Sequence, residues 1–182
     1  MNYKTTEWLP SLIATSKTLG KIPRSLGGND TIDWLPVDVA ANSIVELALS
    51  RVTYSELETH ALHCFNLVNP HTSKWSEMVT AIQEYYSSKN GSQIQVVEFN
   101  EWLDDLMNID IGEHGISAEE ISRSYPALRL LGLFQDWNSK AGGSKFTLRF
   151  ATESAVGRSK ALAEARPVDA HMMGRWLSSW DF

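Results

Sequence analysis

Tyr85 and Lys89 stand four positions apart, a spacing that could serve proton transfer. On a helix, a lysine one turn away from a tyrosine lowers the pKa of the phenol, which can then pass a proton to a substrate. Tyr85, however, also falls on the apolar stripe of its predicted helix, and Asn90-Gly91 follows Lys89 as a helix end. No nucleotide-binding loop precedes the pair. We therefore interpret Tyr85 as a packing residue, and an independent small enzyme that uses this pair is the less favoured alternative.

The other candidates for chemistry are weaker. Gly27-Gly28 and Gly142-Gly143 lack the G-x-G-x-x-G spacing and the strand-to-helix context of a dinucleotide-binding loop. Neither a G-x-x-x-x-G-K-[ST] loop nor a G-x-S-x-G nucleophile elbow occurs. His60, His63 and Cys64 are metal ligands by type, but we expect Cys64 to start a buried strand and to point away from its neighbour. We therefore predict no metal site.

The composition is that of an ordinary globular protein. Of 182 residues, 43% are hydrophobic and 21% are charged, which excludes a disordered, coiled-coil or collagen-like chain. The net charge of −6 argues against nucleic acid and anionic membrane surfaces as partners. One cysteine cannot form an internal disulfide, and no apolar run is long enough to span a membrane, so we expect a cytoplasmic location. The unusual feature is the seven tryptophans.

Helical periodicity dominates the chain and predicts an α+β, mostly helical fold of six or seven helices with a few short strands. Flexible connectors are expected near residues 108–115 and 139–145. Short strands are expected at residues 64–68 and 94–97. The predicted helices cover residues 7–20, 38–51 with Asp38 as N-cap, 73–90 with Ser73 as cap, 99–107, 126–134, 155–165 and 167–180.

Four landmarks follow one another along the chain. They are EWLPSLI at residues 7–13, GKIP at 20–23, DWLPVDVA at 33–40, and FNLVNP at 65–70 followed by Trp75. In this order they resemble the C-terminal portion of thioester reductase domains, as found in nonribosomal peptide synthetases, fungal synthetase-like reductases and carboxylic acid reductases. The tail is similar too, with Ser159-x-x-Leu162 followed by Trp176 and Trp180. The resemblance covers nearly the whole chain, and residues 33–40 are its most specific part.

The resemblance implies an extended short-chain dehydrogenase that uses NADPH to release a carrier-bound acyl or peptidyl thioester as an aldehyde or alcohol. In that family the N-terminal Rossmann half binds NADPH and supplies the catalytic residues, while the C-terminal half shapes the acyl pocket and helps meet the carrier protein. This sequence begins after the family's catalytic Tyr-x-x-x-Lys, so Tyr85 and Lys89 do not inherit that role. We therefore expect residues 1–182 to form a single substrate-binding subdomain that lacks most of the Rossmann half. It should contain no catalytic or cofactor-binding residue and be inactive alone.

The same resemblance suggests which residues and partners matter. Trp8 and Leu12 lie closest in sequence to the missing active site, and Trp34 belongs either to the core or to a pocket wall, so these three are the candidate substrate-pocket residues. The expected partners are a phosphopantetheinylated carrier protein with its acyl thioester, the missing Rossmann half, and a second copy of the chain. The alternative function is a non-catalytic module that docks a carrier protein or oligomerises through the apolar face that a missing half would leave.

Overall fold

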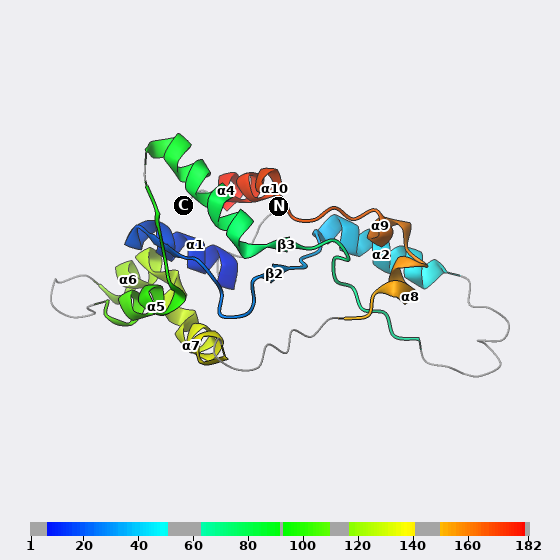
Figure 1. The fold of residues 1–182 in the computed structure, drawn as a ribbon, viewed down its shortest axis with the longest axis horizontal. Coiled ribbons are helices and arrows are strands. Elements are labelled where there is room, and N and C mark those ends of the chain that lie inside the picture. The colour runs from blue at the N-terminus through cyan, green and yellow to red at the C-terminus, as the bar shows by residue number, and fades with distance from the viewer. Residues whose placement is uncertain (1–6, 51–62, 92, 110–116, 141–149, 181–182) are drawn as a thin grey trace. The chain divides into compact units, whose positions relative to one another are not determined.

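The computed structural model describes residues 7–50, 63–91, 93–109, 117–140 and 150–180 (Figure 1). It divides the chain into a first unit (Met1–Asp30, Lys74–Phe146 and Asp169–Phe182) and a second unit (Thr31–Ser73 and Thr147–Val168). Both expected connectors, near residues 108–115 and 139–145, fall mostly outside the described residues, as do His60 and Gly142-Gly143. That the two units act as one functional domain stays a prediction. No helix of the described residues has the length and hydrophobicity needed to cross a membrane.

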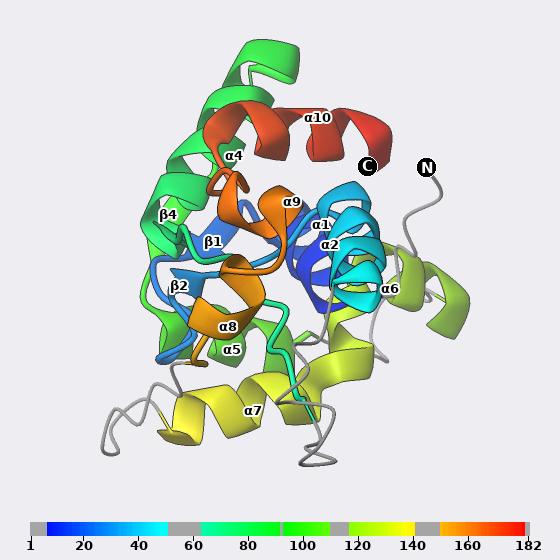
Figure 2. The same ribbon diagram turned by 90° about the vertical axis from the view of Figure 1, so that its right-hand side faces the viewer.

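The first unit packs helices around a short parallel pair of strands. Strands β1 (Lys21–Pro23) and β4 (Gln95–Val97) pair with Ile22 opposite Val96. Helix α10 packs along α4, and α1 packs against η1, as Figures 1 and 2 show for α10 and α4. The helices are α1 (Trp8–Leu19), α4 (Trp75–Asn90), α5 (Phe99–Met107), α6 (Ala118–Ser124), the 3₁₀ helix η1 (Pro126–Leu130), α7 (Leu131–Lys140) and α10 (Ala170–Trp180).

Local signals explain the ends of the two longest helices of this unit. Gly20 follows α1 with φ 69°, and Gly91 follows α4 with φ 70°, both in the left-handed region that glycine adopts without strain. The amide of Gly20 donates to the carbonyls of Lys17 and Ser16, which closes the last turn of α1. Both predicted helix ends are therefore confirmed.

The second unit is built around α2 (Val37–Leu49), which packs on the single-turn helix α9 (Lys160–Ala163). Figure 2 shows these two helices beside each other, with the short α8 (Glu153–Val156) next to α9. Strand β2 (Thr31–Ile32) pairs with β3 (Ser73–Lys74). Asn69, which is 2% exposed, joins separate segments of this unit because its side-chain amide donates to the carbonyls of Trp34 at 3.2 Å and Arg166 at 2.8 Å.

Nine α-helices lie in the described residues, so the mostly helical α+β fold is confirmed, with more helices than the six or seven expected. Part of the larger number of helices arises because two predicted helices are each divided into two elements. The predicted helix at residues 126–134 is a 3₁₀ turn followed by α7, and the one at 155–165 is two single turns. Helix α6 was not predicted, although Ser117 and Glu120 form a capping box, a signal that sequence alone offers.

Two predicted helix caps are wrong. Helix α2 begins at Val37 with Pro36 as its N-cap residue, so Asp38 lies inside the first turn, where its charge favours the helix dipole without capping. Helix α4 has Lys74 as its N-cap residue, and Ser73 belongs to β3. The first amide of α4, that of Trp75, instead donates to the carbonyl of Asp30 at 2.8 Å. Backbone from a distant segment thus replaces the predicted serine cap.

The predicted strand at residues 64–68 is also wrong. These residues follow a non-helical path with no strand paired to them in the described parts of the chain, and Cys64 is exposed instead of buried. A strand needs a hydrogen-bonded neighbour, and the apolar pattern of a short segment cannot supply one.

Glu46 fastens α2 to α9. Its Oε2 atom accepts hydrogen bonds from the hydroxyl of Ser159 at 2.7 Å and from the amide of Ala161 at 2.9 Å. These bonds, the amide of Ala161 first and the hydroxyl of Ser159 second, lower the pKa of Glu46 below the usual 4.5. The charged carboxylate is therefore the form that holds the two helices together.

Acid should weaken the link between α2 and α9, and replacing Glu46 should remove this sensitivity to acid. Because the folded pKa of Glu46 is depressed, its stabilisation is present above 4.5 and is lost as pH falls through the folded value. We expect the urea midpoint of Glu46→Gln to fall less between about pH 7 and about pH 3 than the urea midpoint of the wild type. The control, Glu153→Gln on α8, should keep the wild-type pH profile. Identical profiles for Glu46→Gln and the wild type would contradict the assignment.

Candidate functional site

Five aromatic rings of the described part of the first unit form a continuous series, which we call the aromatic cluster. Trp8 on α1 meets Trp137 on α7 edge to face, with ring centroids 5.1 Å apart. Trp137 contacts Phe134 at 5.6 Å, and Phe134 contacts Trp102 on α5 at 5.3 Å. Trp102 stacks on Phe99 at 6.1 Å. All four centroid distances lie in the range of favourable aromatic pairs.

The aromatic cluster is open to solvent at one end. Phe99, Trp102 and Phe134 are buried, whereas Trp8 and Trp137 are half-buried. Large rings that are apolar and partly accessible are the kind of surface on which an apolar ligand can be bound. Trp8 and Trp137 are therefore the candidate ligand-contacting residues of this unit.

The three predicted pocket residues occupy different environments. Trp8 and Leu12 lie one turn apart on the same face of α1, but Leu12 is 0% exposed and offers no surface to a ligand. Leu12 therefore belongs to the core that supports Trp8. Trp34 belongs to the second unit, where it is half-buried and its backbone carbonyl accepts the hydrogen bond from Asn69.

Sequence reasoning missed Trp137. Its position three residues after Phe134 is a helical spacing that could have included it. Its backbone is also closely approached by Gly27, where φ is +64° and an added Cβ would lie 2.5 Å from the Trp137 carbonyl oxygen. Only glycine fits this approach, so the loop after β1 holds α7, and with it Trp137, in place.

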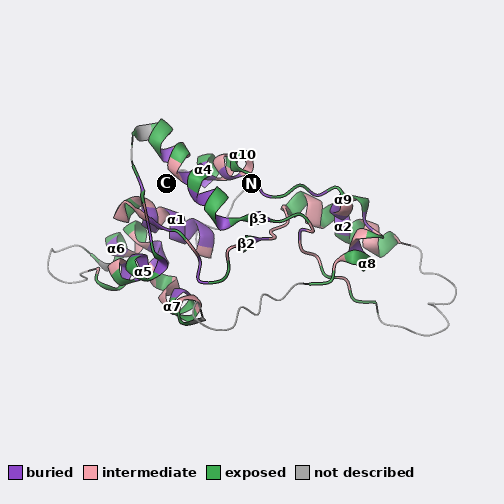
Figure 3. Ribbon diagram, viewed as in Figure 1, coloured by how far each residue is buried: buried purple, intermediate pink, exposed green. Residues whose placement is uncertain are grey.

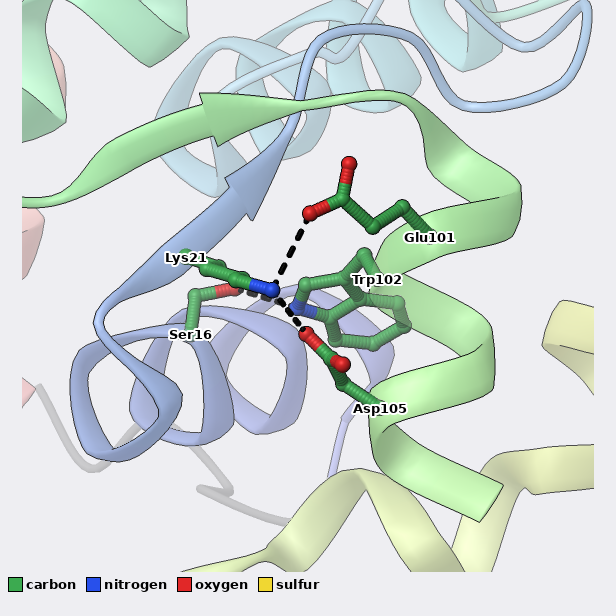
Figure 4. A network of polar contacts seen from close by, with 5 residues as sticks. All are labelled: Ser16, Lys21, Glu101, Trp102 and Asp105. Carbon is green, nitrogen blue, oxygen red and sulfur yellow. Dashed lines mark hydrogen bonds and ion pairs between the residues drawn. The ribbon is translucent and has the colours of Figure 1, made fainter. Parts of the chain in front are cut away.

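A polar network anchors α5, the helix that carries Trp102 (Figure 4). The indole N–H of Trp102 donates to the hydroxyl of Ser16 on α1 at 3.0 Å, in a buried position. On the strand side, Nζ of Lys21 lies between two carboxylates of α5, 2.7 Å from Asp105 and 3.0 Å from Glu101. Helix α5 is thus linked to α1 through Trp102 and to β1 through Lys21.

The charge on Lys21 is set by this network. Hydrogen bonds to Asp105 first and Glu101 second raise the pKa of Lys21 above its usual 10.5. The amine is therefore protonated near neutral pH and cannot act as a base or nucleophile. Because all three side chains are partly exposed, these ion pairs contribute little to stability. Their role is to position α5 against β1.

Tyr85 and Lys89 lie in contact with each other on α4. The ammonium of Lys89 lies over the ring of Tyr85, 5.5 Å from its centroid, in a cation–π contact that supports the packing interpretation. The next residue, Tyr86, is buried, and burial raises the pKa of Tyr86 to about 12, with Tyr85 adding to the effect. Its phenol is therefore no proton carrier near neutral pH.

The candidate metal ligands and the candidate dinucleotide loop of the sequence have other surroundings where the structure describes them. No group of three or more His, Cys, Asp or Glu side chains among them is placed to hold a metal. The loop containing Gly27 and Gly28 follows β1, but it leads into β2 and not into a helix, and Gly27 packs against Trp137. The loop therefore lacks the strand-to-helix context of the common dinucleotide-binding loop.

Comparison with known proteins finds relatives of nearly the whole chain, although no family model matches it. The chain is 32% identical over 180 residues to "Carboxylic acid reductase" of Neurospora crassa, covering 97% of this chain and 16% of that protein. It is 25% identical over 192 residues to "Adenylate-forming reductase Nps11" of Serpula lacrymans, covering 98% of this chain and 16% of that protein. It is 26% identical over 176 residues to "Clavatol synthase claF" of Penicillium crustosum, covering 96% of this chain and 6% of that protein.

The chain is thus similar over nearly its whole length to these relatives, and it matches their C-terminal portion. It spans 16% or less of the length of these relatives. Their names support a reductase-related role for this chain.

Several residues of the landmarks that carry this resemblance make hydrogen bonds within the fold. The indole of Trp75 donates to the carbonyl of Pro23 at 2.9 Å, and Asn69 donates to the carbonyl of Trp34. Ser159 caps α9 by accepting from the amide of Leu162. The first two bonds join segments that are far apart in sequence, and the third caps the start of α9. These landmark residues therefore stabilise the fold.

Proposed function

We propose that this chain is the substrate-binding portion of an NADPH-dependent thioester reductase domain. Such a domain would release an acyl or peptidyl group, carried as a phosphopantetheine thioester on a carrier protein, as an aldehyde or alcohol. The observation that carries the proposal is the similarity of nearly the whole chain to the C-terminal portion of reductases. The chain's own contribution would be to bind the acyl group.

The aromatic cluster supports a binding role for the first unit. Trp8 and Trp137 present partly accessible rings, and their positions are set by buried aromatic neighbours and by the close approach of Gly27. An apolar acyl chain loses unfavourable contact with water on such a surface. Pre-positioned rings lose little conformational entropy when they bind.

The catalytic part of the reaction would lie elsewhere in the reductase domain. The described residues hold Lys21 as a paired cation and place Lys89 over a ring, and the loop containing Gly27 leads into β2 and not into a helix. We therefore propose that NADPH and the reacting carbonyl are held by the preceding part of the domain. The isolated chain should then show no turnover.

A titration with S-octanoyl-pantetheine tests the binding role. We expect the indole N–H resonances of Trp8 and Trp137 to shift in two-dimensional NMR spectra, because their rings would contact the acyl chain. Trp8→Ala should weaken binding by about tenfold, which corresponds to about 1.4 kcal/mol. Trp176→Ala on α10 serves as the control and should leave the affinity unchanged.

Two results would contradict the proposed function. One is binding that neither shifts the Trp8 resonance nor weakens in Trp8→Ala. The other is calorimetric binding of NADPH to the isolated chain at micromolar concentration, which would place a cofactor site in this portion. Resonance shifts with a phosphopantetheinylated carrier protein that spare Trp8 and Trp34 would favour the alternative, a module that only docks the carrier.

A further inference from the structure

Helix α2 turns an apolar face to solvent. Among the described residues, four of the seven exposed large hydrophobic side chains lie on this one helix. Figure 3 shows exposed residues along α2. We call this surface the α2 face; it comprises Val37 (59% exposed), Ile44 (55%), Val45 (56%), Leu49 (77%) and the exposed Ala41 and Ala48.

The spacing of the α2 face is that of a helix seam. Val37, Ala41, Ile44 and Ala48 follow one another at intervals of four, three and four residues, which aligns them along one side of the helix. Such a stripe normally faces a core. Large exposed apolar patches on soluble proteins mark interaction sites, whereas single exposed hydrophobic residues do not.

The orientation of α2 is fixed by polar contacts on its opposite side. Glu46 accepts its two hydrogen bonds from Ser159 and Ala161 of the α9 turn, and Ser43 of α2 is buried. Rotating the α2 face inward would turn Glu46 away from the α9 turn and break both of its bonds. The outward direction is therefore specified by the fold.

We propose that the α2 face is covered by the part of the reductase domain that precedes this segment in its relatives. This inference rests on the proposed function. The chain makes up 16% or less of the three relatives compared above and matches their C-terminal portion, so most of each polypeptide precedes the matched segment. A surface in the same polypeptide has a high effective concentration, which favours it over a separate molecule.

Charge argues against a second copy as the occupant. The charged residues of α2 are Asp38 and Glu46, both acidic, and the whole chain has a net charge of −6. Because Glu46 is engaged with α9 on the other side of the helix, pairing α2 with α2 could use only Asp38 of each copy and would gain no ion pair. The surface expected to cover the α2 face is apolar, with a neutral or basic group near Asp38.

Hydrogen exchange in a chimera tests this inference. In the chimera, this chain replaces the matching segment of the Neurospora crassa carboxylic acid reductase, with which it shares 32% identity. We expect the amides of residues 37–49 to exchange at least about tenfold more slowly in the chimera than in the isolated chain, because covering α2 suppresses local opening. Ile44→Glu with Leu49→Glu should abolish that protection and leave the urea midpoint of the isolated chain unchanged. Leu133→Glu on α7, which is 37% exposed, is the matched control and should retain the protection.

Four outcomes would overturn the inference. They are equal exchange in both proteins, a lower urea midpoint for the isolated double variant, protection in an isolated chain that sediments as a dimer, and a chimera that fails to fold although both parts fold separately. Reductase activity separates this inference from the proposed function. An inactive chimera with a protected α2 contradicts the proposed function alone, and an active chimera with an unprotected α2 contradicts this inference alone.

Discussion

Trp102→Ala should lower the free energy of unfolding by about 3–5 kcal/mol, the usual cost of removing a large buried aromatic side chain. Trp102 is 0% exposed, its ring contacts Phe99 and Phe134, and its indole N–H donates to Ser16. The substitution would leave a cavity between Phe99 and Phe134 and remove the hydrogen bond that links α5 to α1. Urea unfolding followed by circular dichroism measures the loss.

Two further variants separate packing from hydrogen bonding at this position. Ser16→Ala keeps the ring but leaves the buried indole N–H of Trp102 without its acceptor, at a cost of about 1–3 kcal/mol. Trp8→Ala, at the half-buried end of the aromatic cluster, should cost less than Trp102→Ala because less buried surface is lost. A Trp102→Ala variant that loses no more stability than Trp8→Ala would contradict the buried position of Trp102.

Gly27→Ala should be the second large effect, with a loss of about 2–5 kcal/mol in unfolding free energy. A φ of +64° costs a residue with a Cβ about 1–2 kcal/mol. The new Cβ would also lie 2.5 Å from the carbonyl oxygen of Trp137, and such overpacking costs about 1–3 kcal/mol more. Because that oxygen belongs to the backbone of α7, the strain cannot be relieved by a side-chain rotation.

Gly20→Ala is the matched control for this prediction. Gly20 has a similar φ of +69°, but no heavy atom lies within 4 Å of the position that a Cβ would take, so only the backbone cost applies. The difference between the two variants isolates the close approach of Gly27 to α7. Equal losses in urea unfolding would show that the approach is looser than the structure places it. A shift of the Trp137 indole resonance in Gly27→Ala alone would report the same contact.

Local sequence signals were sufficient where a helix end depends on its own residues. Gly20 and Gly91 each follow an apolar periodic stretch, and the structure ends α1 and α4 there. The capping box of Ser117 and Glu120 is equally local, and α6 could have been predicted from it. These signals succeed because glycine and capping side chains act on backbone groups within a few residues.

The same kind of reasoning failed where a distant segment supplies the partner. Ser73 has the right type for a cap, but the first amide of α4 is satisfied by the carbonyl of Asp30. Residues 64–68 have the composition of a strand, but no strand pairs with them in the described residues. Asp38 lies inside its helix because Pro36 already provides a suitable backbone entry.

The sequence by itself determined the mostly helical class, the ends of the main helices, and the similarity to reductases, because periodicity, glycine and ordered landmarks are properties of the chain. Only the tertiary structure decided which way these helices face. The spacing of Ile44 and Leu49 predicts a helix, but the bonds of Glu46 to the α9 turn direct that apolar side outward. Likewise, Trp8 gains its partner Trp137 only when α1 and α7 pack together. Such choices depend on contacts between residues far apart in sequence, which periodicity does not encode.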